Sequence, residues 1–213
     1  MRPPRPEPPR PGTTVPAAYD AWLVDLDGTL YWPVPVRLAM AAELALFGPR
    51  SALLLRQFRK AHEELRRLEF EGDPFRIQIA RTAQALGRSE REIEAVVSNW
   101  MIERPARWVG LFRRKSLLAE IESFRKRGGR TALVSDYPAR RKLAALGASD
   151  LFDVVVASGE PRGPLRLKPH PNGMLRAAEA LAVTPARCLV IGDRDDADGL
   201  AARSAGMAFH LVR

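Results

Sequence analysis

The sequence predicts an α/β protein in which a doubly wound, parallel sheet is interrupted after its first strand by an all-helical segment. Two observations predict this fold. In residues 128–213, short apolar segments alternate with helical segments, which is the pattern of parallel strands joined by helical crossovers. Another apolar segment begins near residue 22, and residues 36–127 then follow a helical period almost throughout. The helical segment is therefore predicted to be an insertion into one α/β core.

The predicted strands are short, apolar segments without the alternation of a half-exposed strand. Such runs are typical of a parallel sheet that is buried on both faces. The segments between them have the length and spacing of helices, with Gly147 as one stop signal. The predicted strands are residues 22–26, 131–134, 152–157, 188–191 and 208–212, and the helices between the last four cover 138–146, a stretch that ends near 181, and 199–205.

Proline, glycine and capping residues divide the helical insertion. Pro33 and Pro35 are predicted to keep the preceding segment out of a helix, because proline breaks a helix interior. Asp73 is placed to cap a helix that begins at Pro74, and Ser89 begins a capping box. The predicted helices are residues 36–47, 53–70, 74–86, one from 90 that Pro105 closes, and 113–127.

The N-terminal residues 1–17 are crowded with proline and arginine and lack the apolar stretch of a secretory signal, so we expect a disordered tail. No stretch approaches the run of about 20 apolar residues that spans a bilayer. Cys188 is the single cysteine and has apolar neighbours, which favours a buried structural thiol. We expect a cytoplasmic protein with a core of residues 18–36 and 113–213 and a helical cap of residues 37–112.

The chain has 213 residues and a formal net charge of +9, and most of the excess lies in the helical insertion. Residues 37–127 hold 19 basic and 12 acidic side chains. A basic surface attracts nucleic acid, acidic lipid or a polyanionic small molecule. The alternative is an arginine-rich surface that only contacts water.

Polar side chains follow three of the predicted strands at the point where each strand ends. Ligands of such sheets bind outside the carboxyl ends of the strands, so these side chains are expected to meet there. The two carboxylates that follow the first strand are separated by one residue, and a divalent cation or a proton would relieve their repulsion. The residues are Asp25 and Asp27 after the first strand, Ser135 and Asp136 after the second, and Asp193 after the fourth, with Lys168 on a loop that leads to the same edge.

These motifs, in this order, resemble the haloacid dehalogenase-like (HAD) hydrolase superfamily. One such motif would be a weak signal, but four in order are a strong one, and the resemblance covers all of the chain except the tail. The helical insertion resembles the C1-type cap of that family. The matching motifs are Asp25-Leu26-Asp27-Gly28-Thr29-Leu30, Val134-Ser135-Asp136, Lys168-Pro169, and Ile191-Gly192-Asp193-Arg194 with Asp196 and Asp198.

The resemblance implies a role for each matching residue. Asp25 corresponds to a nucleophile that forms an aspartyl-phosphate, and Asp27 to the general acid and base. Lys168 would neutralise developing charge. The phosphoryl group would be bound by Thr29, Ser135 and Asp136, and a magnesium ion by Asp25, the backbone carbonyl of Asp27 and Asp193.

The fourth motif leaves a choice between two further acidic residues. Asp198 matches the second acidic position of many relatives, and Asp196 competes with it. Either would act through water or by positioning Lys168. Alternatively, both carboxylates only cap the following helix.

The sequence also leads to expectations for Tyr31, Trp32 and His62. Tyr31 and Trp32 follow the first motif, where they contact the substrate or pack the hinge to the cap. His62 lies in a charged helical segment and is expected to face solvent.

The leading hypothesis is a magnesium-dependent phosphatase that acts on a small phosphorylated metabolite. Dehalogenases of the family usually lack the second aspartate of the first motif, so the presence of Asp27 favours phosphoryl transfer to water. A phosphomutase, another hydrolase of the family, or a non-catalytic module that uses its basic cap are the alternatives. We do not expect nucleic acid as a partner, and the oligomeric state is open.

Overall fold

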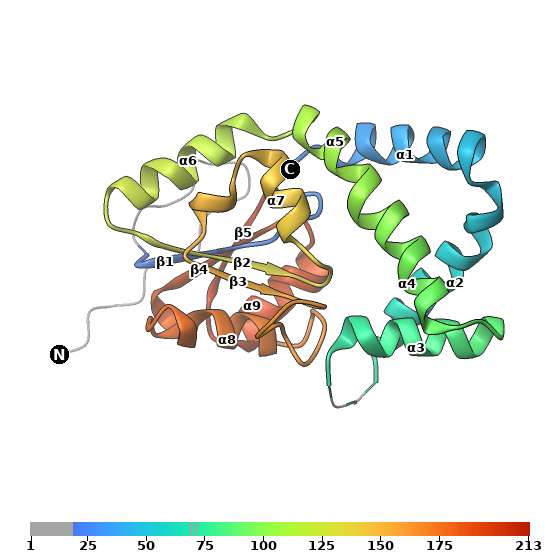
Figure 1. Ribbon diagram of the computed structural model, residues 1–213. Helices are drawn as coiled ribbons and strands as arrows, with labels where there is room; N and C mark the ends of the chain where they lie inside the picture. Colours follow the sequence, from blue (N-terminus) through green and yellow to red (C-terminus); the bar gives the residue numbers. More distant parts are fainter. Residues whose placement is uncertain (1–18, 69, 71) are drawn as a thin grey trace.

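The computed structural model describes residues 19–68, 70 and 72–213. It contains a parallel sheet with helices on both faces, and a group of helices that stands beside the carboxyl ends of the strands (Figure 1). The tail predicted for residues 1–17 lies outside the described residues.

The predicted parallel sheet is confirmed. In the described part of the chain it has five strands in the order β3-β2-β1-β4-β5, all paired in parallel. This order places β1 at the centre, where its residues pair with β2 on one side and β4 on the other. The strands are β1 (Ala21–Val24), β2 (Arg130–Ser135), β3 (Val154–Ala157), β4 (Cys188–Gly192) and β5 (Ala208–Leu211).

Alternate side chains of β1 enter separate apolar cores on the two faces of the sheet, as the period of a strand requires. Trp22 and Val24 pack on the face that α6 (Lys115–Lys126) and α7 (Arg140–Leu146) cover. Ala21 and Leu23 pack under α8 (Asn172–Ala180) and α9 (Leu200–Ser204). The indole of Trp22 stacks on the ring of Phe124 with centroids 4.1 Å apart. Burial of both faces explains why β1 is apolar at every position.

The helices beside the sheet have an apolar core of their own, which α2, α3 and α4 form around the fully buried Phe58. The helices are α1 (Pro33–Phe47), α2 (Ala52–Leu65), α3 (Pro74–Leu86), α4 (Glu90–Val97) and α5 (Arg104–Leu111), with a wider π-helical turn at Ser98–Glu103 between the last two. Shorter helical turns lie at Pro49–Ser51, Ser149–Leu151, Pro185–Arg187 and Asp195–Gly199.

The predicted caps of α3 and α4 are confirmed. The Asp73 carboxylate accepts a hydrogen bond from the Phe75 amide at 2.8 Å, and the Ser89 hydroxyl accepts one from the Glu92 amide at 3.3 Å. Gly87 ends α3 in the left-handed conformation, with a φ of 61°.

Three predicted helix boundaries are wrong. Helix α1 begins at Pro33, not at residue 36, because prolines in a first turn lack only amides that have no partner in the helix. Pro105 does not close the fourth helix. It lies in the first turn of α5, and the π-helical turn before it joins α4 to α5 without a break. Helix α2 ends at Leu65, before the predicted end at residue 70.

The two connections between the sheet and these helices lie side by side. Tyr31 and Arg113 form an antiparallel bridge. The amide of Trp32 donates to the carbonyl of Phe112 at 2.9 Å, and the amide of Arg114 donates to the carbonyl of Leu30 at 2.9 Å. The chain therefore leaves the core and returns to it through one short two-stranded tie.

Among the described residues, no single helix is long and apolar enough to cross a membrane. Helices α1 and α2 reach that length and apolarity only as a pair, and they are bent by 111° at the break between them.

Truncation of Phe58 tests the apolar core of α2, α3 and α4. Because its ring is fully buried, we expect Phe58→Ala to lower the free energy of unfolding by about 3–5 kcal/mol. Leu53 lies on the same helix but is 67% exposed, so Leu53→Ala should change stability by less than about 0.5 kcal/mol. Urea denaturation followed by circular dichroism measures both, and equal losses would contradict the described core.

Candidate active site

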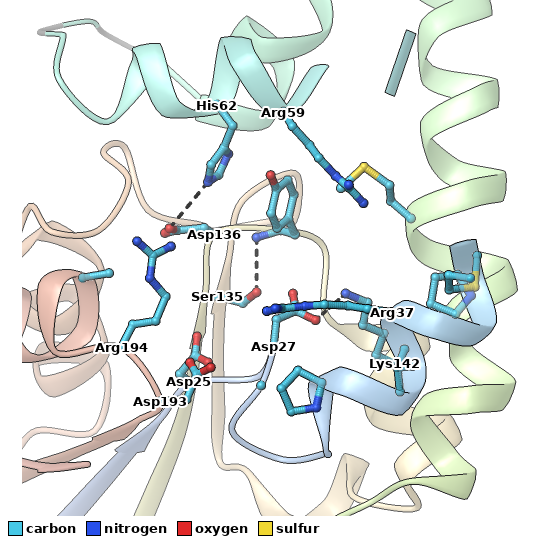
Figure 2. A pocket seen from close by; sticks show the side chains of 18 of the residues that line it. Asp25, Asp27, Arg37, Arg59, His62, Ser135, Asp136, Lys142, Asp193 and Arg194 are labelled. Carbon is cyan, nitrogen blue, oxygen red and sulfur yellow. Dashed lines mark hydrogen bonds and ion pairs between the residues drawn. The ribbon is translucent and has the colours of Figure 1, made fainter. Parts of the chain in front are cut away.

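A cavity of about 750 Å³ opens between the carboxyl ends of the strands and the helices beside them. Its floor carries the polar residues at the ends of β1, β2 and β4, α2 lies above it, and α1 and the turn before α5 complete the wall (Figure 2). The structure thus brings together the predicted residues Asp25, Asp27, Ser135, Asp136, Lys168, Asp193 and Asp198.

Asp25 is held from two sides. Its Oδ1 accepts a hydrogen bond from the Lys168 ammonium, and its Oδ2 accepts one from the Thr29 hydroxyl at 2.9 Å. Asp25 is 6% exposed, and burial raises the pKa of its carboxyl, as do the nearby charges of Asp198 and Asp27, while Lys168 opposes the rise. Thr29 is fully buried.

The Lys168 ammonium lies between two carboxylates. It donates to Asp25, to the Asp198 Oδ1 at 2.7 Å and to the carbonyl of Val134 at 3.3 Å. Burial alone would lower the pKa of Lys168, but the charges of Asp198 and Asp25 outweigh burial and raise it. Lys168 therefore stays charged in a buried position.

Asp27 has different partners from Asp25. Its Oδ1 accepts hydrogen bonds from the Tyr31 hydroxyl at 2.6 Å and from the Lys142 ammonium at 2.5 Å. Burial by itself raises the pKa of Asp27, but the charge of Lys142 and these hydrogen bonds outweigh it, so the pKa is lowered. No hydrogen bond from the described residues reaches Oδ2.

Sequence reasoning missed Lys142. The sequence feature that could have identified Lys142 is its place in the first turns of α7, the helix that follows β2 and begins at the same edge of the sheet. Its neighbours Arg140 and Arg141 are basic too, and only the packing shows that Lys142 is the residue that turns into the cavity, where it is 6% exposed.

Three carboxylates are placed to share a cation. Oxygens of Asp25, Asp193 and Asp198 lie within 4.8 Å of one another. Burial raises the pKa of Asp193, and the charge of Asp198 adds to the rise. A divalent cation would relieve this repulsion, and an all-oxygen donor set fits Mg²⁺.

Two glycines allow this close approach. Gly28 has a φ of +98°, and a Cβ atom there would lie 2.1 Å from a carboxylate oxygen of Asp193. A Cβ on Gly192 would lie 2.5 Å from the carboxylate of Asp198. The acidic cluster therefore depends on the missing side chains at both positions.

The two further acidic residues of the fourth motif lie in different places. Asp198 is 2% exposed, and it binds Lys168 and accepts a hydrogen bond from the Arg194 amide at 3.2 Å. Asp196 is exposed, and its carboxylate pairs with the Arg194 guanidinium at 2.6 Å. The structure thus places Asp198, and not Asp196, beside Lys168.

Ser135 and Asp136, at the end of β2, have different partners. The Ser135 hydroxyl oxygen accepts a hydrogen bond from the Tyr137 amide at 3.2 Å. The Asp136 Oδ1 accepts one from the Lys168 amide at 3.1 Å, and its Oδ2 accepts one from Arg66, the residue that directly follows α2, at 3.1 Å. Asp136 thus joins the Lys168 loop to α2.

His62 does not face solvent as expected. It is 2% exposed, stacks on Tyr137 with ring centroids 4.5 Å apart, and its Nδ1 lies 3.1 Å from the Gln78 amide oxygen. Its Nε2 lies 3.8 Å from Asp136 (Figure 2). Burial lowers the pKa of His62. The charged residues around His62 in the sequence concealed this buried position.

The sequence matches the family of haloacid dehalogenase-like hydrolases over residues 19–206. The match covers far more than half of the chain. The chain belongs to the haloacid dehalogenase-like hydrolases. Membership of this family makes the protein a hydrolase, and the resemblance that the four motifs predicted is confirmed. No curated protein matches the sequence.

Solved structures of this family share the fold. An L-2-haloacid dehalogenase from Xanthobacter autotrophicus is 18% identical, with a TM-score of 0.62 over 91% of this chain and 77% of that one. A HAD phosphatase from Thermococcus onnurineus is 19% identical, with a TM-score of 0.57 over 91% and 86%. A beta-phosphoglucomutase from Clostridium difficile is 19% identical, with a TM-score of 0.53 over 90% and 83%. At these identities the likeness shows the fold alone.

Neutralising the two acidic residues of the fourth motif, one at a time, tests the buried cluster. Because Asp198 is buried against Lys168, Asp198→Asn should lower the free energy of unfolding by about 2 kcal/mol or more. Asp196→Asn removes an exposed ion pair and should cost at most about 0.5 kcal/mol. Urea denaturation in the presence of a chelator measures both, and a smaller loss for Asp198→Asn would refute the ordering.

The lowered pKa of His62 predicts a pH dependence of stability. The unfolded chain, in which the pKa is near the model-peptide value of 6.5, takes up the proton before the folded chain does. The contribution of His62 is therefore complete above about pH 6.5 and is lost as the pH falls toward the folded-state pKa. We expect the His62→Gln variant to lose less stability between pH 7.5 and pH 5.5 than the unmodified protein does. Thermal denaturation at the two pH values measures this loss. The control, His170→Gln, changes an exposed histidine and should not alter this loss.

Proposed function

We propose that the protein is a magnesium-dependent phosphatase that hydrolyses a small phosphomonoester through an aspartyl-phosphate on Asp25. One observation carries most of the weight: the two carboxylates that follow β1 have different partners. Asp25 is bound by Lys168 and Thr29, whereas Asp27 is bound by Lys142 and Tyr31. Two carboxylates in different environments can take the separate roles of nucleophile and proton carrier.

In the first step, a carboxylate oxygen of Asp25 attacks phosphorus, and the bond from phosphorus to the ester oxygen breaks. The leaving oxygen takes a proton from Asp27. Lys168 and Thr29 hold the Asp25 carboxylate in one orientation. The Ser135 hydroxyl oxygen accepts from an amide, so its own proton is free to bind a phosphoryl oxygen.

In the second step, a water molecule attacks the phosphorus of the aspartyl-phosphate, and Asp27 takes a proton from it. The bond between Asp25 and phosphorus breaks, which releases inorganic phosphate and restores the carboxylate. Asp27 keeps a single orientation because Lys142 and Tyr31 hold Oδ1. The proton is therefore carried by Oδ2.

The lowered pKa of Asp27 suits its role as a base, and substrate binding prepares its role as an acid. The charge of Lys142 keeps the carboxylate ionised. A phosphoryl dianion beside Asp27 adds negative charge and raises its pKa. The proton is thus held more firmly when the ester is bound.

The proposed magnesium site is formed by Asp25, Asp193 and the backbone carbonyl of Asp27, with Asp198 beside them. A bound Mg²⁺ would neutralise charge on the phosphoryl oxygens. We also retain as proposals a core of residues 18–36 and 113–213, a cap of residues 37–112, and a cytoplasmic location.

Release of phosphate from an aryl phosphate tests this function. We expect activity that requires Mg²⁺, is abolished by a chelator and falls by about a thousandfold or more in Asp25→Asn. Asp196→Asn changes an exposed acidic residue of the same motifs and should retain the activity. Equal, chelator-insensitive rates for the unmodified protein and Asp25→Asn would exclude the proposed mechanism.

The same preparations distinguish the other functions. Chloride release from 2-chloropropionate would indicate a dehalogenase, and transfer of phosphate between positions of a sugar phosphate without net release would indicate a phosphomutase. Nucleic-acid binding that weakens steeply with salt, without any turnover, would indicate a binding module.

A further inference from the structure

Most basic side chains that line the cavity have an acidic partner. Lys168 is bound by Asp25 and Asp198, and Lys142 by Asp27. The remaining partnered cations are Arg66, which pairs with Asp136 at 3.1 Å and Glu63 at 3.6 Å, and Arg194, which pairs with Asp196. These charges are satisfied within the protein.

Arg37 and Arg59 differ from the other cations of the cavity. Neither has an ion pair or hydrogen bond with any of the described residues, and both line the cavity. They come from different helices, Arg37 from the first turns of α1 and Arg59 from the middle of α2. Figure 2 shows Arg37 extending toward Asp27 and Arg59 pointing down from above. Arg37 is close enough to Tyr31 for its charge to oppose the rise of the Tyr31 pKa that burial causes.

The wall around these two guanidinium groups is apolar. Glu63 also lines the cavity but pairs with Arg66, so no carboxylate of the described residues binds Arg37 or Arg59, and the apolar wall excludes water from a ligand that fills the space. The volume of about 750 Å³ is also far larger than one phosphoryl group needs, since a water molecule occupies about 30 Å³ in the liquid. The lining side chains on this side are Val36, Met40, Leu44, Leu55, Trp100 and Met101.

We propose that the substrate is a phosphomonoester whose body is largely apolar and carries a second anionic group, a carboxylate or a phosphate, that Arg37 and Arg59 bind. The inference rests on the proposed function, because the phosphoryl group must lie at Asp25 for the second anion to face these arginines. An anion at this position receives charge-assisted hydrogen bonds from two guanidinium groups, while Asp193 on the floor of the cavity is left for the cation.

The chemistry of the cavity favours this substrate over a neutral phosphomonoester. Arg37 and Arg59 are exposed to solvent, so a neutral body that fills the apolar space would cover part of these two charges without giving them an ionic partner. A polyhydroxylated body would find few hydrogen-bonding partners on the wall of α1, α2 and the turn before α5. A carbon skeleton that ends in a second anion matches both the charges and the apolar surface.

Matched aryl phosphates test the second anion. The substrates are phenyl phosphate, para-carboxyphenyl phosphate, its neutral isostere para-carbamoylphenyl phosphate, and the para-bisphosphate of hydroquinone. We expect kcat/KM for the carboxylate to exceed that for the amide by about tenfold at low salt, which corresponds to about 1.4 kcal/mol. The bisphosphate shows whether a phosphate is bound as well as a carboxylate.

Three variants assign this preference to residues. Arg37→Gln and Arg59→Gln should each reduce the ratio of carboxylate to amide, and the double variant should bring it close to one. Arg56→Gln is the matched control, because Arg56 is an exposed arginine of the same helix that does not line the cavity. It removes the same charge and should leave the ratio unchanged.

Binding to Asp25→Asn separates this inference from the proposed function. Intrinsic tryptophan fluorescence, to which Trp100 in the cavity wall contributes, reports ligand binding without turnover. Tighter binding of the carboxylate than of the amide, lost when Arg37→Gln and Arg59→Gln are added, would support the inference even if no ester is hydrolysed.

Two results would overturn the inference. The first is hydrolysis of phenyl phosphate without any preference for an anion, in rate or in binding, which would leave the proposed phosphatase activity in place. Second, if Arg56→Gln reduces the preference for the carboxylate as much as Arg37→Gln and Arg59→Gln do, the preference comes from the general positive charge of the surface, and the inference is overturned.

Discussion

The arrangement of the site depends on one buried ammonium group. Lys168 stands between Asp25 and Asp198 at the carboxyl edge of the sheet, and its backbone amide is bound in turn by Asp136. Three carboxylates gathered in a buried space would repel one another without this charge. The strand order of the parallel sheet brings these groups together. Strand β1 lies at the centre and ends between β2 and β4, so residues distant in the sequence meet at one edge. Fold and site are therefore two consequences of the same strand order.

Much of this fold can be predicted from the sequence, because local signals and burial agree. The apolar runs of the strands are buried on both faces, and Asp73 and Ser89 cap the helices that their spacing indicates. The helix boundaries at Pro33 and Pro105 could not be predicted by a rule about helix interiors. At both places proline stands in a first turn, where the missing amide has no partner to lose.

The site was predictable where motifs mark it and unpredictable where packing alone decides. The motif residues Asp25, Asp27, Ser135, Asp136, Lys168 and Asp193 line one cavity as expected, because the strand ends and the Lys168 loop meet at one edge of the sheet. Lys142 was missed because its inward position depends on the rotation of α7, which three consecutive basic residues do not reveal. His62 was misjudged because it lies among charged residues, although its own side of α2 packs on Tyr137.

The two-stranded tie at Tyr31 and Arg113 has a consequence for motion. The tie is the pivot on which α1 to α5 would turn against the sheet, and the Tyr31 hydroxyl holds Asp27 from that pivot. A rotation that widens the entrance to the cavity must displace this hydroxyl, or stretch its bond to the carboxylate. The position of these helices and the orientation of the Asp27 carboxylate are thus linked through one tyrosine.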